Sequence, residues 1–347
     1  MSLSKNLLLR LETPGLFEAI ADAPRLTAAG GKTFPVFNPA TEELLAELPD
    51  MGVAETRLAI ERAAAAQGEW AAMTARERSD TLWRWHQLIV RHTEDLAVIL
   101  TAEMGKPLAE ARSEVSHAAA YLQWYAEEAN RIYGETIAAP SRDRRMIVIK
   151  QPIGVVGAIT PWNFPASMVA RKISPALAAG CTIVLKPAEQ TPLVAGAMFL
   201  LAEKAGFPPG VVNLIYASEG DAVGRELCTN ATVRKISFTG STEVGRLLMR
   251  QCSDQVKKLS LELGGNAPFI VFDDADIDAA VDGAVQAKFR NAGQTCVSAN
   301  RLYVQAGVHD EFAEKFIARV KTLSVGDGFD PDVAIDPMID TRARANI

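Results

Sequence analysis

The chain has 347 residues, 48% of them hydrophobic, and a formal net charge of -6 at pH 7. A chain of this length can bury a sizeable core and is expected to divide into two domains or more. The acidic balance argues against nucleic acid, whose recognition calls for a clustered basic face, and leaves a small molecule as the expected partner.

The distribution of apolar residues and cysteines narrows the class of protein. No apolar run is long enough to cross a bilayer and acidic residues interrupt the first one, so we expect no membrane partner, no targeting segment and a cytoplasmic location. Cys181, Cys228, Cys252 and Cys296 are far apart, and no CxxC or HExxH is present. We therefore expect reduced thiols and no metal site. No GxSxG elbow occurs either, which removes the usual serine-hydrolase interpretation.

The first predicted elements are three long helices. They lie at residues 54–67, 75–101 and 108–133, where apolar residues recur at helical spacing. Residues 133–152 then predict a protruding β-hairpin, in which a polar tip separates two short apolar runs. A hairpin on a globular body cannot bury both of its faces, so pairing with another subunit is one way to cover it.

From Gly154 onward, short apolar runs alternate with helical stretches. The runs GVVGAIT, TIVLK, VVNLIY and KISFT are each followed by a helical pattern, which predicts a parallel, doubly wound α/β sheet. Ligands of such sheets bind at the carboxyl ends of the strands. A second α/β unit follows, with runs at KKLSLELGG, PFIVF and RLYVQ. We place the two domains at residues 1–255 and 256–347.

The segment KISFTGSTEVGRLLM predicts a strand, a glycine turn and a helix. Gly240 lets the backbone approach a ligand, and Ser241 is placed to cap the first helical turn, whose free N–H groups suit a pyrophosphate. A plain strand-to-helix turn is the alternative, because neither GxGxxG nor a Walker A sequence is present.

Two other segments also follow predicted strands. KPAEQTP puts Lys186 and Glu189 at a sheet end where a ribose could lie, although alone this segment is better explained as a surface loop. PWNFP holds Asn163 between prolines that fix the backbone. The Asn163 amide is therefore a candidate oxyanion donor, or else a structural turn amide.

The candidate reactive groups lie in LELGGNAP and KFRNAGQTC. Glu262 stands beside a glycine turn in an apolar segment, where a carboxylate is costly unless it is paired or works as an acid or base. Cys296 ends a small polar loop after an amphipathic helix. It is either one more buried thiol or a nucleophile.

In their order along the chain, PWNFP, KPAEQTP, FTGSTEVG, LELGGNAP and GQTC resemble the NAD(P)-dependent aldehyde dehydrogenase superfamily. FRNAGQTC and WNFPASMVARK are most similar to its succinate-semialdehyde dehydrogenases. The resemblance implies a Rossmann-type NAD-binding domain with an oligomerisation hairpin, the amino-terminal part of a catalytic domain, and a homodimer or homotetramer for the full-length family member.

By this resemblance Cys296 is the nucleophile that converts an aldehyde to a thiohemiacetal and then a thioester. Asn163, together with the Cys296 N–H, would hold the oxyanion, and Glu262 would be the general base for the hydrolytic water. Arg171 and Arg290 match carboxylate-binding arginines, which would select a semialdehyde with a distal acid group. Two surface salt-bridge arginines are the alternative.

The resemblance also assigns the cofactor site. Lys186 and Glu189 would bind the adenosine ribose, and a carboxylate there would repel the 2′-phosphate of NADP, so we predict NAD over NADP. The remaining cofactor-binding residues are those under the pyrophosphate and along the channel, namely Gly240, Ser241, Gly245, Trp162 and Leu263.

Several positions depart from the family pattern. Ser298 stands where succinate-semialdehyde dehydrogenases often carry a second cysteine, so no disulfide switch is expected. Asp336 stands where a glycine is usual, and after IDPMIDTRARANI the family's Glu-Ile-Phe-Gly-Pro-like segment and last strand are not found. The chain is therefore expected to be a truncated or fragmentary member of the family.

Three other functions stay open. Glutarate or ketoglutarate semialdehyde fits the same chemistry, because two arginines fix charge better than chain length. A cysteine-dependent esterase or amidase would use Cys296 and Glu262 without a nucleotide. An inactive fragment would retain only part of the fold.

Overall fold

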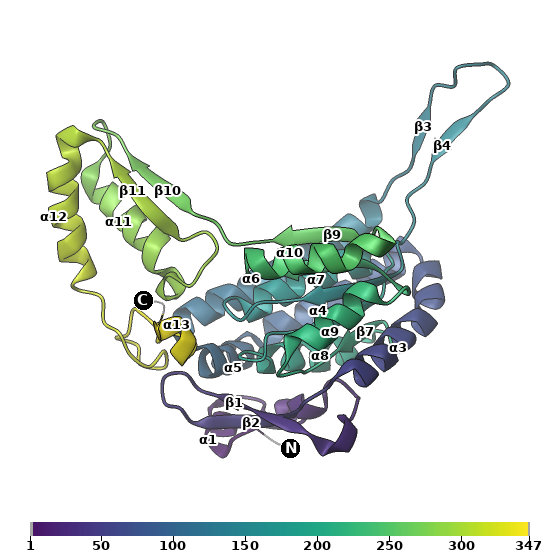
Figure 1. Ribbon diagram of the computed structural model, residues 1–347, viewed down its shortest axis with the longest axis horizontal. Helices are drawn as coiled ribbons and strands as arrows, with labels where there is room; N and C mark the ends of the chain where they lie inside the picture. Colours follow the sequence, from purple (N-terminus) through teal and green to yellow (C-terminus); the bar gives the residue numbers. More distant parts are fainter. Residues whose placement is uncertain (1–2, 346–347) are drawn as a thin grey trace.

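The computed structural model describes residues 3–345, so the outermost positions of the two predicted domains, 1–2 and 346–347, lie outside it. Figure 1 shows a large body, a smaller lobe built from β10, β11, α11 and α12, and a hairpin of β3 and β4 that projects from the body. No helix in the described part of the chain is long and apolar enough to span a bilayer.

The elements alternate as an α/β chain should. The strands are β1 (Thr33–Phe37), β2 (Leu44–Pro49), β3 (Glu135–Ile137), β4 (Met146–Val148), β5 (Val155–Ile159), β6 (Ile183–Lys186), β7 (Val212–Leu214), β8 (Val233–Thr239), β9 (Lys258–Glu262), β10 (Ala267–Val271) and β11 (Ala299–Val304). The helices are α1 (Lys5–Arg10), α2 (Pro14–Phe17), α3 (Val53–Ala72), α4 (Ala75–Arg91), α5 (Thr93–Met104), α6 (Leu108–Glu128), α7 (Pro165–Ala178), α8 (Leu193–Ala205), α9 (Gly220–Thr229), α10 (Thr242–Cys252), α11 (Ile277–Phe289), α12 (His309–Val320) and α13 (Thr341–Ala345).

The body is organised by a five-stranded sheet in the order β7-β6-β5-β8-β9. All of its neighbouring strands are parallel, which confirms the predicted doubly wound sheet. The chain builds outward from β5 to β7 and then returns to the other side of β5 with β8. A topological switch point therefore lies between β5 and β8, where sheets of this kind bind ligands.

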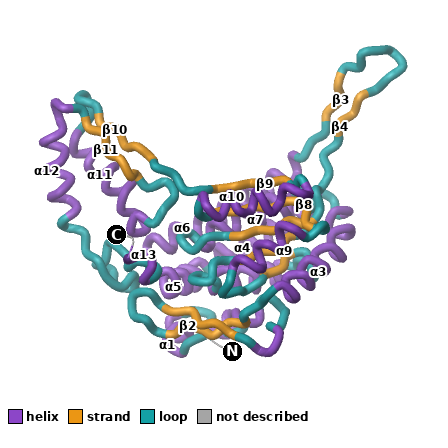
Figure 2. Tube along the Cα trace, in the orientation of Figure 1, coloured by secondary structure: helices purple, strands orange, loops and turns teal. Residues whose placement is uncertain are grey.

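Side chains that alternate along the strands supply two cores. Ile183 and Leu185 of β6 pack in one cluster, whereas Val184 between them packs in the other. This is the period of two that a strand covered on both faces requires. The first cluster includes residues of α4 to α8, and the second includes residues of α3, α9 and α10. In Figure 2 the strands run through the body between these helices.

The predicted helix at 75–101 is two helices, α4 and α5. The division falls at His92, whose φ of -103° and ψ of 26° end α4 and precede α5. Asp95 at the start of α5 accepts the N–H groups of Glu12 and Thr13, at 2.6 and 3.3 Å. The break therefore lets α5 start with a carboxylate that holds the amino-terminal segment. The third predicted helix ends as α6 at Glu128, and the antiparallel pair of β1 and β2 was not predicted.

The small lobe has two parallel strands, β10 and β11. Its buried core is Val271, Val281, Ala284 and Phe312. The predicted boundary at 255/256 stays a prediction, but β9, which falls on the lobe's side of it, pairs with β8 in the body's sheet. Residues after the lobe return to the body, where the Leu108 N–H donates to the Gly328 carbonyl at 2.9 Å.

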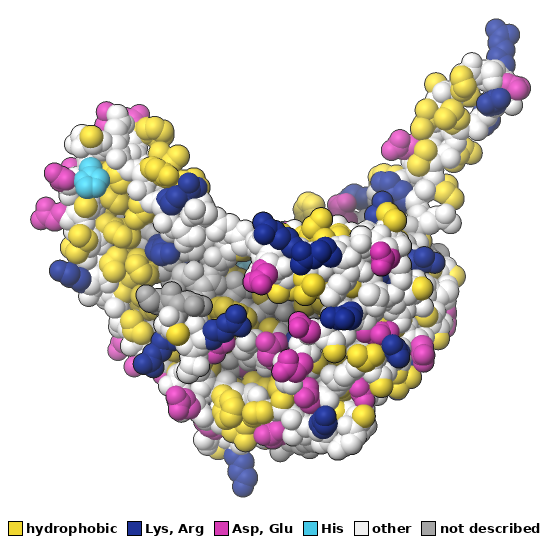
Figure 3. All heavy atoms as spheres, viewed as in Figure 1, with side chains coloured by type: hydrophobic (Ala, Val, Ile, Leu, Met, Phe, Trp, Pro, Cys, Tyr) yellow, Lys and Arg dark blue, Asp and Glu magenta, His cyan; other side chains and the backbone are white. Residues whose placement is uncertain are grey.

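The predicted hairpin is confirmed as the antiparallel pair β3 and β4. All six residues of the two strands are exposed. Figure 3 shows hydrophobic side chains along this hairpin and Lys or Arg side chains at its tip. The apolar side chains Ile137 (45% exposed) and Ile147 (69%) are among those without cover.

Candidate active site

Four of the predicted site segments meet at one edge of the body's sheet. Asn163 follows β5, Lys186 ends β6, Ser241 follows β8 and Glu262 ends β9. The register places Ile159 of β5 between Lys186 of β6 and Phe238 of β8. The carboxyl ends of these parallel strands therefore lie at the switch point, where a ligand is expected.

Cys296 is exposed, whereas Cys181, Cys228 and Cys252 are buried. The nucleophile interpretation required an accessible sulfur, and Cys296 has one. The loop before it takes a left-handed backbone at three successive residues, with φ of 56° at Asn291, 54° at Ala292 and 74° at Gly293. Such values are unusual for the two residues that are not glycine, so contacts must hold the loop in this conformation.

The Asn163 amide is fixed by the cysteine loop itself. Its Nδ2 donates to the Gln294 carbonyl at 2.8 Å, and Nδ2 of Asn291 donates to the Asn163 carbonyl at 3.2 Å. One of the two amide hydrogens is thus used to bind the loop, and the other is left for a ligand. The structure brings Asn163 and the Cys296 loop together although 131 positions separate the residues of the first bond.

Glu262 and Arg171 form an ion pair, with Oε1 of the carboxylate 2.8 Å from Nη2 of the guanidinium. Both side chains are partly open to solvent, at 46% and 40% exposure. The arginine predicted to bind the substrate therefore holds the predicted base. Nearby in α7, burial lowers the pKa of Lys172 to about 8, and its Nζ donates to the Ser237 hydroxyl at 3.2 Å.

A hollow of about 810 Å³ lies between these strand ends and the carboxyl-terminal segment, from which Ile339, Asp340, Arg342 and Ala343 line it. Trp162 and Ser241, both predicted cofactor residues, line it together with Gln190, Val244 and Arg250. The Ser241 hydroxyl caps α10 by accepting the Val244 N–H at 3.2 Å, which leaves the first amides of the helix free to face an anion.

The glycines of this region have packing roles. A Cβ at Gly245 would stand 2.6 Å from Leu263, and one at Gly240 would stand 2.5 Å from the ring of Phe238. Only glycine allows these side chains to lie so close to the turn and the first turn of α10. The hollow, the first N–H groups of α10 and the turn without a side chain at Gly240 together fit a dinucleotide.

Lys186 and Glu189 also form an ion pair, Nζ to Oε2, at 2.9 Å. Lys186 is buried, and the Glu189 side chain is 40% exposed. The carboxylate is therefore largely neutralised by its neighbour. The predicted preference for NAD assumes that Glu189 is an isolated negative charge. Pairing with Lys186 weakens the electrostatic repulsion between this carboxylate and a 2′-phosphate.

Arg290 lies on the lobe, directly after α11. Its guanidinium carbon is 5.3 Å from the centre of the Phe164 ring, next to Asn163. The second predicted substrate arginine therefore faces the body across the site.

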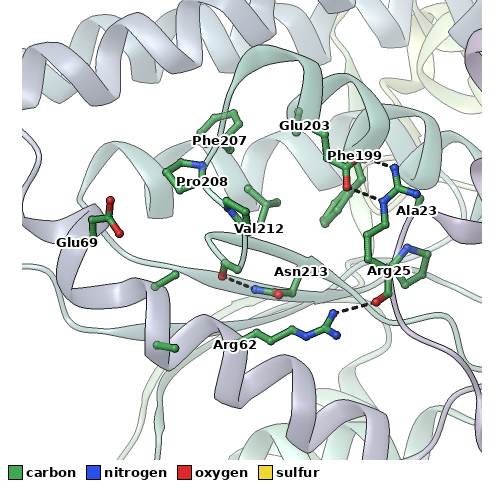
Figure 4. A pocket seen from close by; sticks show the side chains of 16 residues that line it. Ala23, Arg25, Arg62, Glu69, Phe199, Glu203, Phe207, Pro208, Val212 and Asn213 are labelled. Atoms are coloured by element: carbon green, nitrogen blue, oxygen red, sulfur yellow. Dashed lines mark hydrogen bonds and ion pairs between the residues drawn. The ribbon is translucent and has the colours of Figure 1, made fainter.

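A second hollow, of about 830 Å³, lies elsewhere on the body (Figure 4). It is lined by α3 and by the end of α8, and the Arg25–Glu203 ion pair at 2.7 Å closes one side. None of the predicted nucleophile, base or amide residues line it. Its walls offer no reactive side chain, so we do not place the active site there.

Sequence reasoning missed the charged groups beneath the site. Lys106 and Glu114 are buried, and Glu110 is partly buried. The available signal was the spacing of Lys106, Glu110 and Glu114, four residues apart and so on one face of the predicted helix and the residues just before it. Burial also raises the pKa of Asp336, which the sequence had marked only as a departure from a usual glycine, to about 7. Among residues 3–345, no cluster of His, Cys, Asp and Glu is arranged to hold a metal ion.

The chain resembles known proteins over its whole length. The profile of the aldehyde dehydrogenase family matches residues 26–347. A probable succinate-semialdehyde dehydrogenase of Sinorhizobium fredii, named for NADP(+), is 75% identical over 100% of this chain and 71% of its own. A glutarate-semialdehyde dehydrogenase of Pseudomonas putida is 56% identical over 95% of this chain and 68% of its own.

A solved structure described as an E. coli NADP-dependent enzyme has a TM-score of 0.91 and 58% identity to this chain. The match covers 92% of this chain and 66% of that one. The present chain thus spans about two thirds of the length of these relatives. The similarity includes both the body's sheet and the cysteine lobe.

Proposed function

The chain belongs to the aldehyde dehydrogenase family, and we propose that it oxidises succinate semialdehyde to succinate with a nicotinamide dinucleotide. The observation that carries the proposal is the exposed Cys296 on a loop bonded to the Asn163 amide, which follows β5, while Glu262 ends β9 at the same edge of the sheet. A nucleophile, an oxyanion donor and a base are the three groups that acyl-forming aldehyde oxidation needs.

In the proposed mechanism, Sγ of Cys296 adds as a thiolate to the aldehyde carbon, and the carbonyl oxygen becomes an oxyanion. The second hydrogen of Asn163 Nδ2 and the Cys296 N–H donate to that oxygen. Trp162 and Ser241 would help to hold the nucleotide, whose nicotinamide ring would accept the hydride that leaves the carbon. Glu262 then takes a proton from the water whose oxygen adds to the thioester carbon, the C–S bond breaks, and Cys296 leaves as the thiolate that began the cycle.

Glu262 must leave Arg171 to act on water, because the two are paired at 2.8 Å. A substrate carboxylate competes for the same guanidinium, since arginine binds carboxylates in a bidentate manner. Binding of an acid semialdehyde to Arg171 and Arg290 would therefore also free the base. Glutarate semialdehyde is the second candidate, because the Pseudomonas putida relative carries that name and both substrates have a terminal acid.

The cofactor that we propose is NADP. Two of the more similar relatives, from Sinorhizobium fredii and E. coli, are named for NADP, and they do not support the NAD preference predicted from Glu189. The pair with Lys186 gives the physical reason, because a 2′-phosphate would meet a neutralised carboxylate beside a lysine. Trp162, Ser241 and Arg250 line the hollow that would hold the nucleotide.

We also propose that the hairpin pairs with a second copy of the chain in a homo-oligomer. Its strands expose Ile137, Met146 and Ile147, and exposed paired strands of this kind are normally covered. The site residues named above all lie outside the hairpin, so this proposal is independent of the chemistry.

The test is formation of NADPH when succinate semialdehyde and NADP are added to the purified chain, with Cys296→Ser measured in parallel. We expect absorbance of reduced nicotinamide from the wild-type chain and a loss of about 10³-fold or more from the variant. Glutarate semialdehyde and NAD in separate reactions rank the second substrate and cofactor. Ester hydrolysis that depends on Cys296, without NADPH formation, would favour the esterase alternative.

A further inference from the structure

Three charged side chains beneath the site come from α6 and the turn before it. Lys106 precedes the helix, and Glu110 and Glu114 lie one helical turn apart within it. The Lys106 and Glu114 side chains are each only 1% exposed. Buried charges are costly unless they are bonded, so their partners show what they hold in place.

Lys106 and Glu114 hold the Asn163 segment. Lys106 Nζ donates to the Asn163 carbonyl at 2.8 Å, and it also pairs with Glu114. Glu114 Oε1 accepts the N–H groups of Ala166 and Ser167, at 2.9 and 3.1 Å, at the start of α7. The turn that carries the proposed oxyanion donor is thus bonded to α6.

Glu110 holds the other side of the site. Its Oε2 accepts the N–H of Asn291 at 3.0 Å, across 181 positions of sequence. Asn291 is fully buried and begins the left-handed stretch that leads to Cys296. Burial raises the pKa of Glu110, while the charge of Lys106, the bond from the Asn291 N–H and the charge of Arg290 oppose that shift.

The two held segments are also bonded to each other. Asn291 Nδ2 donates to the Asn163 carbonyl at 3.2 Å, and Asn163 Nδ2 donates to the Gln294 carbonyl at 2.8 Å. The contacts therefore form a closed path from α6 through Asn291 and Asn163 back to α6. Removing one of these hydrogen bonds should therefore loosen the position of the Cys296 loop relative to the Asn163 amide.

We propose that Glu110 is a positioning residue, which holds the strained Asn291–Gly293 stretch and so sets Cys296 in register with Asn163. Its carboxylate accepts a backbone N–H five residues before the cysteine, so it acts through the loop. The effect on turnover rests on the proposed function, but the effect on the loop does not.

The experiment compares Glu110→Ala and Glu110→Gln with the wild-type chain. Glu127→Ala is the matched control, because Glu127 is an exposed glutamate on the same helix. Hydrogen–deuterium exchange of peptides covering residues 289–296 reports the Asn291 amide, and kcat and KM report NADPH formation. Thermal unfolding of each variant identifies any general loss of the fold.

We expect Glu110→Ala to speed exchange at Asn291 by about tenfold or more, as loss of a charged hydrogen bond implies. We expect kcat to fall by about 10- to 100-fold with little change in the KM for NADP, because a misplaced nucleophile affects chemistry more than nucleotide binding. Glu110→Gln should keep most of both properties, since its amide oxygen can accept the same N–H. Glu127→Ala should match the wild type.

Unchanged exchange in Glu110→Ala would overturn the proposal, and so would faster exchange in an active enzyme whose kcat stays the same. If the wild-type chain forms no NADPH, the proposed function fails by itself. In that case the exchange measurement still tests whether Glu110 holds the loop. Faster exchange in Glu110→Ala, but not in Glu127→Ala, supports that contact, and unchanged exchange contradicts it.

Discussion

The body and the lobe are built very differently, although the proposed chemistry needs both. Strand β6 at the centre of the body is buried at every position, from Ile183 to Lys186. Strand β11 of the lobe is exposed at four of its six positions. The lobe's buried core has only four residues. The well-packed body thus carries the hollow proposed for the cofactor, the proposed oxyanion donor and the proposed base, whereas the thinly packed lobe carries the proposed nucleophile.

This difference explains why the contacts between the two units matter. A small core and a side-chain bond, from Ser298 to the Lys288 carbonyl at 3.3 Å, hold the Cys296 loop to its own lobe, so its position also depends on bonds to the body. Asn163, Glu110 and the carboxyl-terminal segment supply them. The Ile339 N–H donates to Gln294 Oε1 at 3.1 Å, for example, and Ile339 itself packs in the body's core.

Phe312→Ala should give the largest effect, by unfolding the lobe while the body stays folded. Phe312 is 3% exposed and is the largest side chain of the lobe's core. Truncation of a buried phenylalanine costs about 3–5 kcal/mol, which a four-residue core cannot easily absorb. Hydrogen exchange should rise across α11 and α12, and β5 and β6 should stay protected. Simultaneous loss of protection in both units would show that the lobe is not separate.

Arg290→Ala tests which unit recognises the substrate. Arg290 lies on the lobe, whereas Arg171 lies on the body and is paired with Glu262. We expect kcat/KM for succinate semialdehyde to fall by about 10- to 100-fold, the cost of a lost charged contact. Use of butyraldehyde, which has the same chain length without the acid, should change little. Equal losses for the two aldehydes would contradict carboxylate recognition by Arg290.

Asp336→Asn should give the smallest effect, on the segment that joins the units. Burial raises the pKa of this carboxyl from its ordinary 3.8 to about 7, and its Oδ1 has no partner among the described residues. The folded chain therefore holds this proton more tightly than the unfolded chain. The contribution of the protonated carboxyl to the free energy of unfolding is fully present below about pH 4, and it is lost as the pH rises through about 7.

Asp336→Asn removes the carboxyl group that would otherwise ionise in the folded chain as the pH rises. We expect Tm to rise by about 2–4 °C at about pH 8, with a smaller rise at about pH 5. Differential scanning calorimetry at the two pH values measures it. Asp332→Asn, at an exposed position of the same segment, is the control. A Tm difference that is independent of pH would show that Asp336 is not the titrating group.

The sequence was sufficient where a motif followed a strand. Lys186, Ser241 and Glu262 each come directly after an apolar run, so their place at one sheet edge followed from the parallel topology. The site's long-range contacts had no such signal. Asn163 and Gln294 meet across 131 positions, and Arg171 and Glu262 across 91. No local pattern encodes those distances.

Charges were the other weakness of sequence reasoning. Glu189 was treated as an isolated carboxylate, although its effect depends on Lys186 three residues away. The sequence also did not predict the helix break at His92, because neither Gly nor Pro stands there. The break lets Asp95 accept hydrogen bonds from the amino-terminal segment, which is far away in the sequence. Tertiary partners decided both cases.

The central claim is that Cys296 forms a covalent thioester that Glu262 helps to hydrolyse. The most direct measurement is mass spectrometry of Glu262→Gln after mixing with succinate semialdehyde and NADP, because loss of the base should let the acyl-enzyme accumulate. We predict a succinyl group on the Cys296 peptide and one NADPH per chain. NADPH formation with Cys296 unmodified, or a succinyl group on another residue, would contradict the account.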